Sequence, residues 1–142
     1  MRYASALTMA LALAGALSPA RGANPPAHTA QIAVISALQP PRLTLHRALL
    51  RNVYLRKIFV DAAGQHLIPV NLPPQSVLRK AFSRAVLPLS EARLEDYWNR
   101  QYFQGVSPPY VLESQRAVVR FVATTPGAIG YVELAYAKQN NM

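Results

Sequence analysis

The stretch Thr124–Val132, which reads TTPGAIGYV, decides the fold of this chain. It follows a segment, Ser114–Ala123, whose valines fall on one stripe at helical spacing, so this segment is predicted to be a helix. Pro126 and Gly127 then end the helix, because proline lacks a backbone donor and glycine tolerates a positive φ. The stretch therefore marks where the last predicted helix gives way to the segment that follows.

That following segment is predicted to be a buried strand. Residues Ala128–Leu134 are mainly apolar and aromatic, which is typical of a short strand enclosed within a sheet. Gly130 is expected where a backbone approaches closely, because glycine has no side chain to keep it away. A helix, a Pro-Gly stop and a buried strand thus form the closing unit of the domain.

Upstream of this unit, apolar segments at the spacing of strands and helices alternate along the chain, separated by proline-containing breaks. Helices are predicted to begin at Thr44, Ser76 and Ser90, since an apolar stripe at helical spacing follows each of them. The order β-α-β-α-α-β-α-β favours an α/β fold with a mainly parallel sheet flanked by helices. The other predicted strands are Ile32–Ser36, the extended pieces Ile58–Val60 and His66–Val70, and Tyr110–Glu113.

The first 23 residues have the pattern of a secretory signal peptide. Arg2 supplies a positive charge, residues 4–17 form an apolar run, and residues 18–23 are mostly small. The apolar run is short for a membrane span, and no cysteine follows it to carry a lipid anchor. A retained N-terminal membrane anchor is the alternative interpretation. The expected cleavage positions are after Ala20, Gly22 or Ala23.

The rest of the chain is predicted to be one exported domain. Residues 24–30 have the composition of a flexible leader, residues 31–137 of a folded domain, and residues 138–142 of a tail. The hydrophobic content of 51% is sufficient for a packed core. We expect a periplasmic protein that has no stable membrane span after signal cleavage.

Composition restricts the partners of this domain. The chain has no cysteine, which removes disulfides, thiol nucleophiles and thiolate metal sites. Its formal net charge is +9, but the basic residues are scattered rather than interleaved with stacking aromatics. Since the protein is also predicted to be exported, nucleic acid is not expected as a partner. The open alternatives are anionic ligands, anionic lipid headgroups, an acidic partner protein, and a basic surface that is merely solvated.

Ser76 and Ser114 are the leading candidates for a ligand site. Each is predicted to cap a helix, and a helix N-terminus presents free backbone N–H groups and partial positive charge that suit an anion. Arg79 and Arg116 lie in the first turn of these helices and add charge-assisted hydrogen bonds. The alternative is that both serines are plain N-caps, which are common.

Other residues that often carry chemistry lack the necessary arrangement. The histidines His28, His46 and His66 do not have metal-ligand spacing, so neither a metal nor a cofactor is expected. Glu91 and Glu95 share a helical face with arginines nearby, which indicates a solvated surface. No catalytic Ser-His-Asp order or phosphate-cradling glycine loop is present, and an enzyme is not expected. The aromatic stripe of the same helix, predicted to be core rather than a stacking platform, comprises Tyr97, Trp98, Tyr102 and Phe103.

Seven segments match one known pattern in their order along the chain. They are Ile32–Ile35, Leu49–Lys57 with Phe59, Ile68–Asn71, Ser76–Phe82, Tyr97–Asn99, Phe103–Gly105 and Thr125–Val132. Together they resemble the domain of phosphate ABC-transporter substrate-binding proteins, in particular the small single-lobe members of that family. The resemblance implies a periplasmic-binding-protein-like α/β domain that binds phosphate or another oxyanion and is linked to ABC-type transport.

The loop before Ser76 departs from this family. The family's ligand loop supplies an arginine, an aspartate and a Ser-Gly-Thr run, whereas residues 71–78 read NLPPQSVL and retain only the serine. Full-length members also clamp the anion between two lobes, and a site on one lobe lacks the burial that strengthens its hydrogen bonds. We therefore expect at most weak oxyanion binding, by Ser76 and the backbone amides from Val77 onward, with Arg79 supplying charge.

The alternative function is that of a ligand-free interaction or signalling module. In that case the domain docks on an envelope protein or self-associates. Loss of the loop chemistry favours this alternative, and a single lobe exposes the surface that a second lobe would cover.

Overall fold

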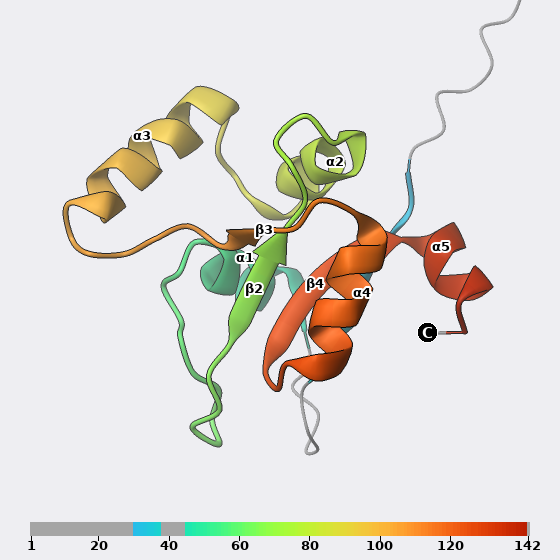
Figure 1. Cartoon of the computed structure of the whole chain (residues 1–142). Coiled ribbons are helices and arrows are strands. Elements are labelled where there is room, and N and C mark those ends of the chain that lie inside the picture. The colour runs from blue at the N-terminus through green and yellow to red at the C-terminus, as the bar shows by residue number, and fades with distance from the viewer. Residues whose placement is uncertain (1–29, 38–44, 142) are drawn as a thin grey trace, which may run out of the picture.

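The computed structural model describes residues 30–37 and 45–141, as an open sheet with helices packed around it (Figure 1). The predicted signal peptide and residues 24–29 of the predicted leader lie outside these ranges. None of the described helices is long and apolar enough to cross a membrane. The elements are β1 (Ile32–Ser36), α1 (Arg47–Tyr54), β2 (Ile68–Asn71), α2 (Val77–Val86), α3 (Glu91–Tyr102), β3 (Tyr110–Val111), α4 (Gln115–Thr124), β4 (Ala128–Glu133) and α5 (Leu134–Gln139).

The four described strands lie in the order β1-β4-β2-β3, so the α/β class is confirmed but the prediction of a mainly parallel sheet is wrong. β4 pairs parallel with β2, and β2 with β3, over two residue pairs each. β1 pairs antiparallel with β4 over five residue pairs, from Ile32–Glu133 to Ser36–Ile129. Alternation of strands and helices does not specify which strands become neighbours. β1 enters at the sheet edge beside the last strand, a position where an antiparallel strand is common.

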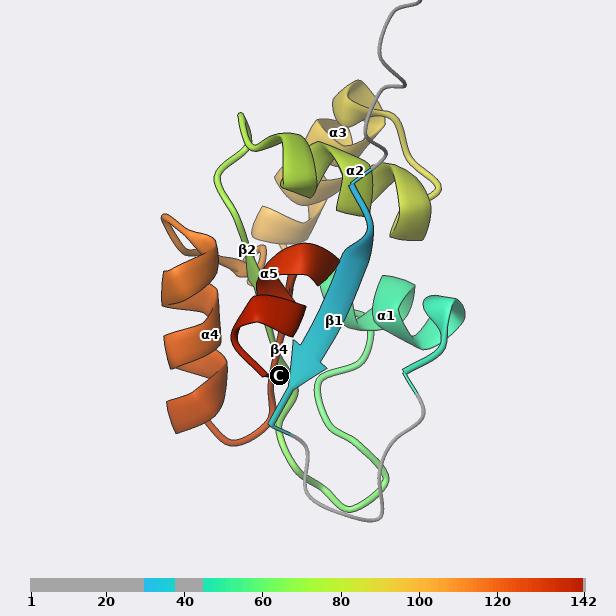
Figure 2. The same cartoon turned by 90° about the vertical axis from the view of Figure 1, so that its right-hand side faces the viewer.

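The closing unit lies at the centre of the fold, as its composition predicts. Every residue of β4 except the last is buried, because α4 covers one face of the strand while α1 and α2 lie on the other side (Figure 2). Gly130 faces α4, where an added Cβ would lie 2.5 Å from Val118 Cγ1. Tyr131 faces the opposite side and packs against Tyr54 and Phe82. The missing side chain of Gly130 therefore allows α4 to pack closely on the sheet.

Helix α3 differs most from its prediction. Its aromatic stripe is predicted to be core, yet none of the twelve residues of this fully described helix is buried. Tyr97 and Trp98 are half-buried, while Tyr102 and Phe103 are exposed. The helix extends away from the sheet (Figure 1), and the Tyr97 hydroxyl ties it to the domain by donating to the Leu55 carbonyl at 2.6 Å. Helical spacing predicts one apolar face correctly, but not how much of that face another element covers.

The helix boundaries also differ from the predicted ones. The predicted cap Thr44 lies outside the described residues, and α1 is capped by His46, whose Nδ1 accepts from the Leu49 amide at 3.2 Å. The strand predicted to reach Leu134 ends one residue earlier, and α5 follows it directly. α5 has no side-chain cap hydrogen bond, so the usual sequence signal for a helix start is missing there.

Candidate functional site

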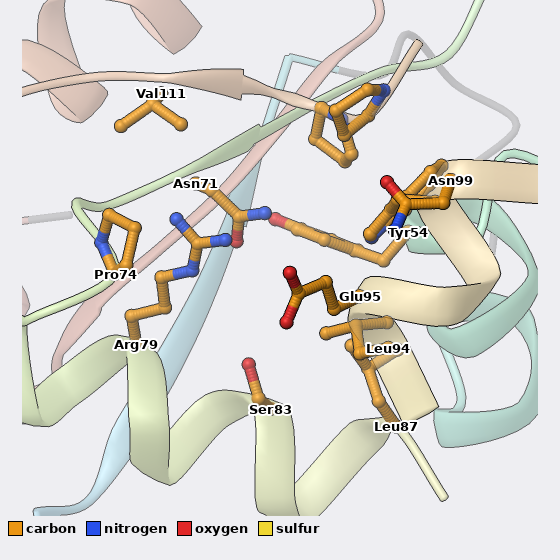
Figure 3. A pocket seen from close by; sticks show the side chains of 13 residues that line it. Tyr54, Asn71, Pro74, Arg79, Ser83, Leu87, Leu94, Glu95, Asn99 and Val111 are labelled. Carbon is orange, nitrogen blue, oxygen red and sulfur yellow. The ribbon is translucent and has the colours of Figure 1, made fainter. Parts of the chain in front are cut away.

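A cleft between α2 and α3 is the most substantial candidate site in the described part of the chain. It consists of two adjoining cavities, one of about 280 Å³ and one of about 670 Å³. We refer to both together as the α2–α3 cleft; Figure 3 shows the smaller cavity. Six residues line both cavities: Pro74, Arg79, Ser83, Leu94, Glu95 and Trp98.

The cleft lies at the end of two parallel strands. Asn71 is the last residue of β2 and Val111 the last of β3, and both line the smaller cavity. Ligands of open α/β sheets bind outside the carboxyl ends of the strands, where loops and helix starts converge. The position of the cleft thus agrees with the usual location of ligand sites in this fold class.

Arg79 is the predicted site residue that the structure places in the cleft. It lines both cavities, and its Nη1 donates to the Leu72 carbonyl oxygen at 2.7 Å. An arginine has five N–H donors in a planar fork, so this bond fixes the orientation of the side chain and leaves other donors available. Figure 3 shows the guanidinium next to Asn71, facing the interior of the cavity.

Ser76 and Val77 are placed differently. The Ser76 hydroxyl accepts a hydrogen bond from the Arg79 amide at 3.3 Å and caps α2, as predicted. The Val77 side chain is 78% exposed. Neither residue belongs to the described lining of the two cavities. The start of α2 therefore contributes Arg79 to the cleft, while the serine is engaged in capping.

Ser114 has the same capping role on another helix. Its hydroxyl accepts from the Ala117 amide at 3.1 Å at the start of α4. Arg116, in the first turn of that helix, is exposed. Neither residue is among those that line the α2–α3 cleft as described, so the structure does not bring the two predicted capping sites together.

The cleft carries both signs of charge, which sequence reasoning missed. Arg79, Lys80 and Arg84 from α2 line the larger cavity, and Glu91 and Glu95 from α3 line it on the other side. Figure 3 shows the Glu95 carboxylate directed into the smaller cavity. The sequence predicts a solvated face for these two glutamates, and the structure shows both exposed. The sequence does not predict that this face lies across a cavity from Arg79. The relevant signal is the spacing of Trp98, which lies four residues after Leu94 and three after Glu95 and is therefore a neighbour of both on the helix surface.

Two buried tyrosines adjoin the cleft: Tyr54 lines the smaller cavity, and Tyr131 lies behind it, in contact with the lining residue Asn71. The Tyr131 hydroxyl donates to Asn71 Oδ1 at 3.0 Å and accepts from the Leu72 amide at 3.3 Å. Burial raises the pKa of Tyr131 to about 12, although the Leu72 amide and the charge of Arg79 act in the opposite direction. Tyr54 lines the smaller cavity, and burial raises its pKa well above the ordinary value. Both hydroxyls stay protonated at neutral pH and serve as hydrogen-bonding groups.

These groups form a binding surface of mixed character. Arginine, serine and asparagine offer hydrogen-bond donors, while Leu94 and Trp98 offer apolar contact. Within the described residues, no three His, Cys, Asp or Glu side chains lie close enough together to hold a metal ion. None of the known protein-family models matches this chain.

Proposed function

We propose that this protein is an exported, non-enzymatic binding module of the phosphate-binding-protein type, built as a single lobe, that binds phosphate or another oxyanion weakly in the α2–α3 cleft. Arg79 is the observation that carries the proposal. It is a predicted anion-binding residue, it lines both cavities, and it lies at the carboxyl ends of two parallel strands. The link to ABC-type transport and the periplasmic location follow from the family resemblance and the predicted signal peptide.

The role of Arg79 follows from its geometry. Its bond to the Leu72 carbonyl holds the guanidinium in place before a ligand arrives, so little side-chain entropy is lost on binding. The donors that remain can form a charge-assisted, forked pair with two oxygens of a phosphate or sulfate. Asn71 and Ser83 line the same cavity and add neutral donors.

Two features keep the expected affinity low. Glu95 lines both cavities, and its carboxylate repels an anion bound beside Arg79. The cleft is also formed by one lobe, so water competes for the hydrogen bonds of the bound anion and weakens them. We expect a dissociation constant on the order of millimolar, which corresponds to about 4 kcal/mol of binding free energy.

Isothermal calorimetry with phosphate and sulfate at low ionic strength tests this proposal. Wild-type protein should give saturable heat, and Arg79→Gln should weaken binding about tenfold or more, because a charge-assisted hydrogen-bonded pair is lost. Arg100→Gln removes the same charge from an exposed α3 residue outside the lining of the cleft and should bind as wild type does. Equal weakening by both substitutions would show that only net charge matters and would contradict a site at Arg79.

A second candidate function is docking on an envelope protein. The observation that favours it is the end of α3, where Tyr102 and Phe103 are 73% and 88% exposed and pack edge to face with centroids 6.1 Å apart. Exposed aromatic pairs are unusual on surfaces that face only water and are enriched at protein interfaces. The pair lies at the C-terminal end of α3, a fully described helix that has no buried residue.

Site-specific photo-crosslinking in cells that export the protein separates this candidate from the first. A photoreactive side chain at position 103 should give one discrete adduct, and the same group at the exposed position 120 on α4 should give none. An adduct of twice the chain mass would identify self-association instead of a different partner. The docking function is contradicted if position 103 yields no adduct, or if positions 103 and 120 yield the same mixture.

A further inference from the structure

A third cavity, of about 390 Å³, is lined by Arg56 and by Tyr110 of β3, and none of its described lining residues is acidic. It is separate from the α2–α3 cleft, although Pro108 and Pro109 contribute to both. Arg56, Phe59 and Tyr110 supply its chemistry, and none of these three residues lines the α2–α3 cleft as described.

Arg56 occupies a backbone position that usually belongs to glycine. It follows α1, where its amide bonds the Val53 carbonyl at 3.0 Å and the next amide, of Lys57, bonds the Asn52 carbonyl at 2.8 Å. This pair of bonds is a Schellman motif, which requires a left-handed residue at the position of Arg56. Arg56 has φ 55°, a conformation that costs free energy for any residue with a Cβ. The Arg56 side chain is therefore held at a backbone position that glycine adopts at lower cost.

The guanidinium of Arg56 is only partly satisfied. Nη1 donates to the Leu67 carbonyl at 3.3 Å, and the planar group lies over the Phe59 ring with Cζ 4.8 Å from the ring centroid. Nε is buried and has no hydrogen-bond acceptor within the described part of the chain. Buried donors without an acceptor are rare in folded proteins and call for a specific explanation.

The described residues around this cavity supply no negative charge to match Arg56. Its described lining contains Arg56, His66, Ser107 and Tyr110 as polar residues, and none of the lining residues is acidic. The nearest acid along the chain is Asp61, whose Oδ1 accepts from the amides of Ala63 and Gln65 at 2.8 and 2.9 Å. That carboxylate is therefore engaged in its own turn. The described lining of the cavity therefore supplies no charge that complements Arg56, and an anionic ligand would supply one.

The remainder of the cavity indicates what else such a ligand carries. The side chains of Phe59 and Tyr110 are 42% and 67% exposed, and Pro108, also exposed, adds a further apolar surface. A bare inorganic anion would leave these surfaces in contact with water. An organic anion with a flat apolar body would cover them and gain from stacking on the aromatic rings. A cavity of this volume is of the size that holds a small ligand.

We propose that this cavity is a second ligand site, which binds small aromatic carboxylates by pairing the carboxylate with Arg56 and placing the ring against Phe59 and Tyr110. Nothing in the proposed oxyanion function requires this site, because the two sets of binding residues do not overlap. The acid-free lining also distinguishes it from the α2–α3 cleft, where Glu91 and Glu95 are present.

The test is a nuclear magnetic resonance titration of the 15N-labelled protein with benzoate, in which the Arg56 Nε–Hε resonance is followed. Benzoate should shift this resonance saturably, because pairing at the neighbouring Nη atoms changes the electronic environment of the whole guanidinium. Benzamide has the same ring without the charge and should bind at least about tenfold more weakly, because the charge-assisted pair is absent. Inorganic phosphate should likewise bind more weakly than benzoate, since it cannot cover the aromatic rings.

Two substitutions of Arg56 test whether this residue forms the benzoate site. Arg56→Gln should lower benzoate affinity about tenfold or more, and Arg56→Gly should do the same while keeping the fold, because glycine suits the left-handed position. Arg120→Gln, on an exposed part of α4, is the charge-matched control and should bind normally. Unchanged benzoate affinity in either Arg56 variant, or equal binding of benzamide and benzoate, would overturn the proposal. Equal or tighter binding of phosphate would overturn the assignment to aromatic carboxylates.

Discussion

Tyr131 and Phe82 stack face to face, with ring centroids 3.9 Å apart and an interplanar angle of 5°. This contact joins the central strand β4 to helix α2. The hydroxyl of the same Tyr131 bonds Asn71 and the Leu72 amide, and the Leu72 carbonyl in turn receives Arg79. The packing of the core thus places the end of β2 and the guanidinium of Arg79 relative to each other. Stability and ligand binding are expected to depend on one connected set of side chains.

Replacing Tyr131 by phenylalanine tests this connection. The ring stack is retained, but the Leu72 amide loses its acceptor and Asn71 loses a donor. We expect the free energy of unfolding to fall by about 1–2 kcal/mol, the cost of leaving buried polar groups without partners. Urea denaturation measures the change. Tyr102→Phe removes a hydroxyl from an exposed ring and should change stability by less than about 0.5 kcal/mol. Equal effects of the two substitutions would contradict a structural role for the Tyr131 hydroxyl.

The same tyrosine predicts a loss of stability at alkaline pH. Burial raises the pKa of Tyr131 from its ordinary value of 10.0 to about 12 in the folded protein. Between these values the unfolded chain releases the phenol proton while the folded chain retains it, so rising pH favours unfolding. The contribution of Tyr131 is fully present below pH 10.0 and is lost as pH rises through about 12, a change of about 2–3 kcal/mol.

Urea denaturation at a series of alkaline pH values measures this loss. The Tyr131→Phe variant should show a shallower decline across the same interval, because it has no proton to release at this position. Part of the decline should persist in the variant, because burial also raises the pKa of Tyr54. A wild-type profile that matches the variant profile would contradict the raised pKa of Tyr131.

The glycines of the closing unit give a third prediction. Gly130→Ala should destabilise the protein by about 1–3 kcal/mol through overpacking, since the new Cβ meets Val118, Val70 and Val122. Val118→Ala should partly rescue it, because the closest obstructing atom belongs to that valine. Thermal unfolding of the two single variants and the double variant measures the coupling. Simple additivity of the two single effects would argue against direct contact between positions 130 and 118.

Gly127→Ala should be more damaging than Gly130→Ala. Gly127 has φ 78°, and an added Cβ would overlap the backbone carbonyl oxygen of His66, which cannot rotate away. Gly64 has nearly the same φ, 80°, with open space around it. Gly64→Ala therefore measures the cost of the positive φ alone, about 1 kcal/mol. The additional loss of stability in Gly127→Ala relative to Gly64→Ala measures the steric overlap. Equal losses of stability in these two variants would contradict that overlap.

Ser76→Ala and Arg79→Gln should separate capping from binding. Loss of the Ser76 cap should reduce stability by about 1 kcal/mol and leave phosphate affinity unchanged, since Ser76 is outside the described lining of the cleft. Arg79→Gln should weaken phosphate binding. Calorimetry combined with urea denaturation measures both quantities for each variant. A large loss of phosphate affinity in Ser76→Ala would indicate that the anion binds at the start of α2. It would contradict the placement of the anion inside the cleft.

The elements of the fold that sequence predicts well are those whose signals are local. The helix, Pro-Gly stop and buried strand around Gly127 are present as expected, and the hydroxyls of Ser76, Ser90 and Ser114 cap helices at the predicted positions. Each depends on a few neighbouring residues, because capping and strand burial are decided by nearby chemistry. The alternation of strands and helices, and with it the α/β class, follows from the same local signals.

The features that were missed depend on distant contacts. The antiparallel direction of β1 arises from pairing with β4, about a hundred residues later in the chain. The periodicity of the sequence does not predict this pairing. The exposure of α3 depends on how little of its surface the other elements of the domain cover. The cleft has the same origin, since Glu95 and Trp98 meet Arg79 only after α2 and α3 are positioned against each other. Arg79 was predictable from its place in the first turn of a helix, but its neighbours were not.

The fluorescence of Trp98 during a phosphate titration tests the central claim most directly. Trp98 is the single tryptophan of the chain and lines both cavities of the α2–α3 cleft, so its emission reports the occupied site itself. We predict a saturable change in emission with a midpoint on the order of millimolar phosphate at low ionic strength, lost in Arg79→Gln and retained in Arg100→Gln. An emission that phosphate leaves unchanged, or a change that persists in Arg79→Gln, would contradict oxyanion binding in the cleft.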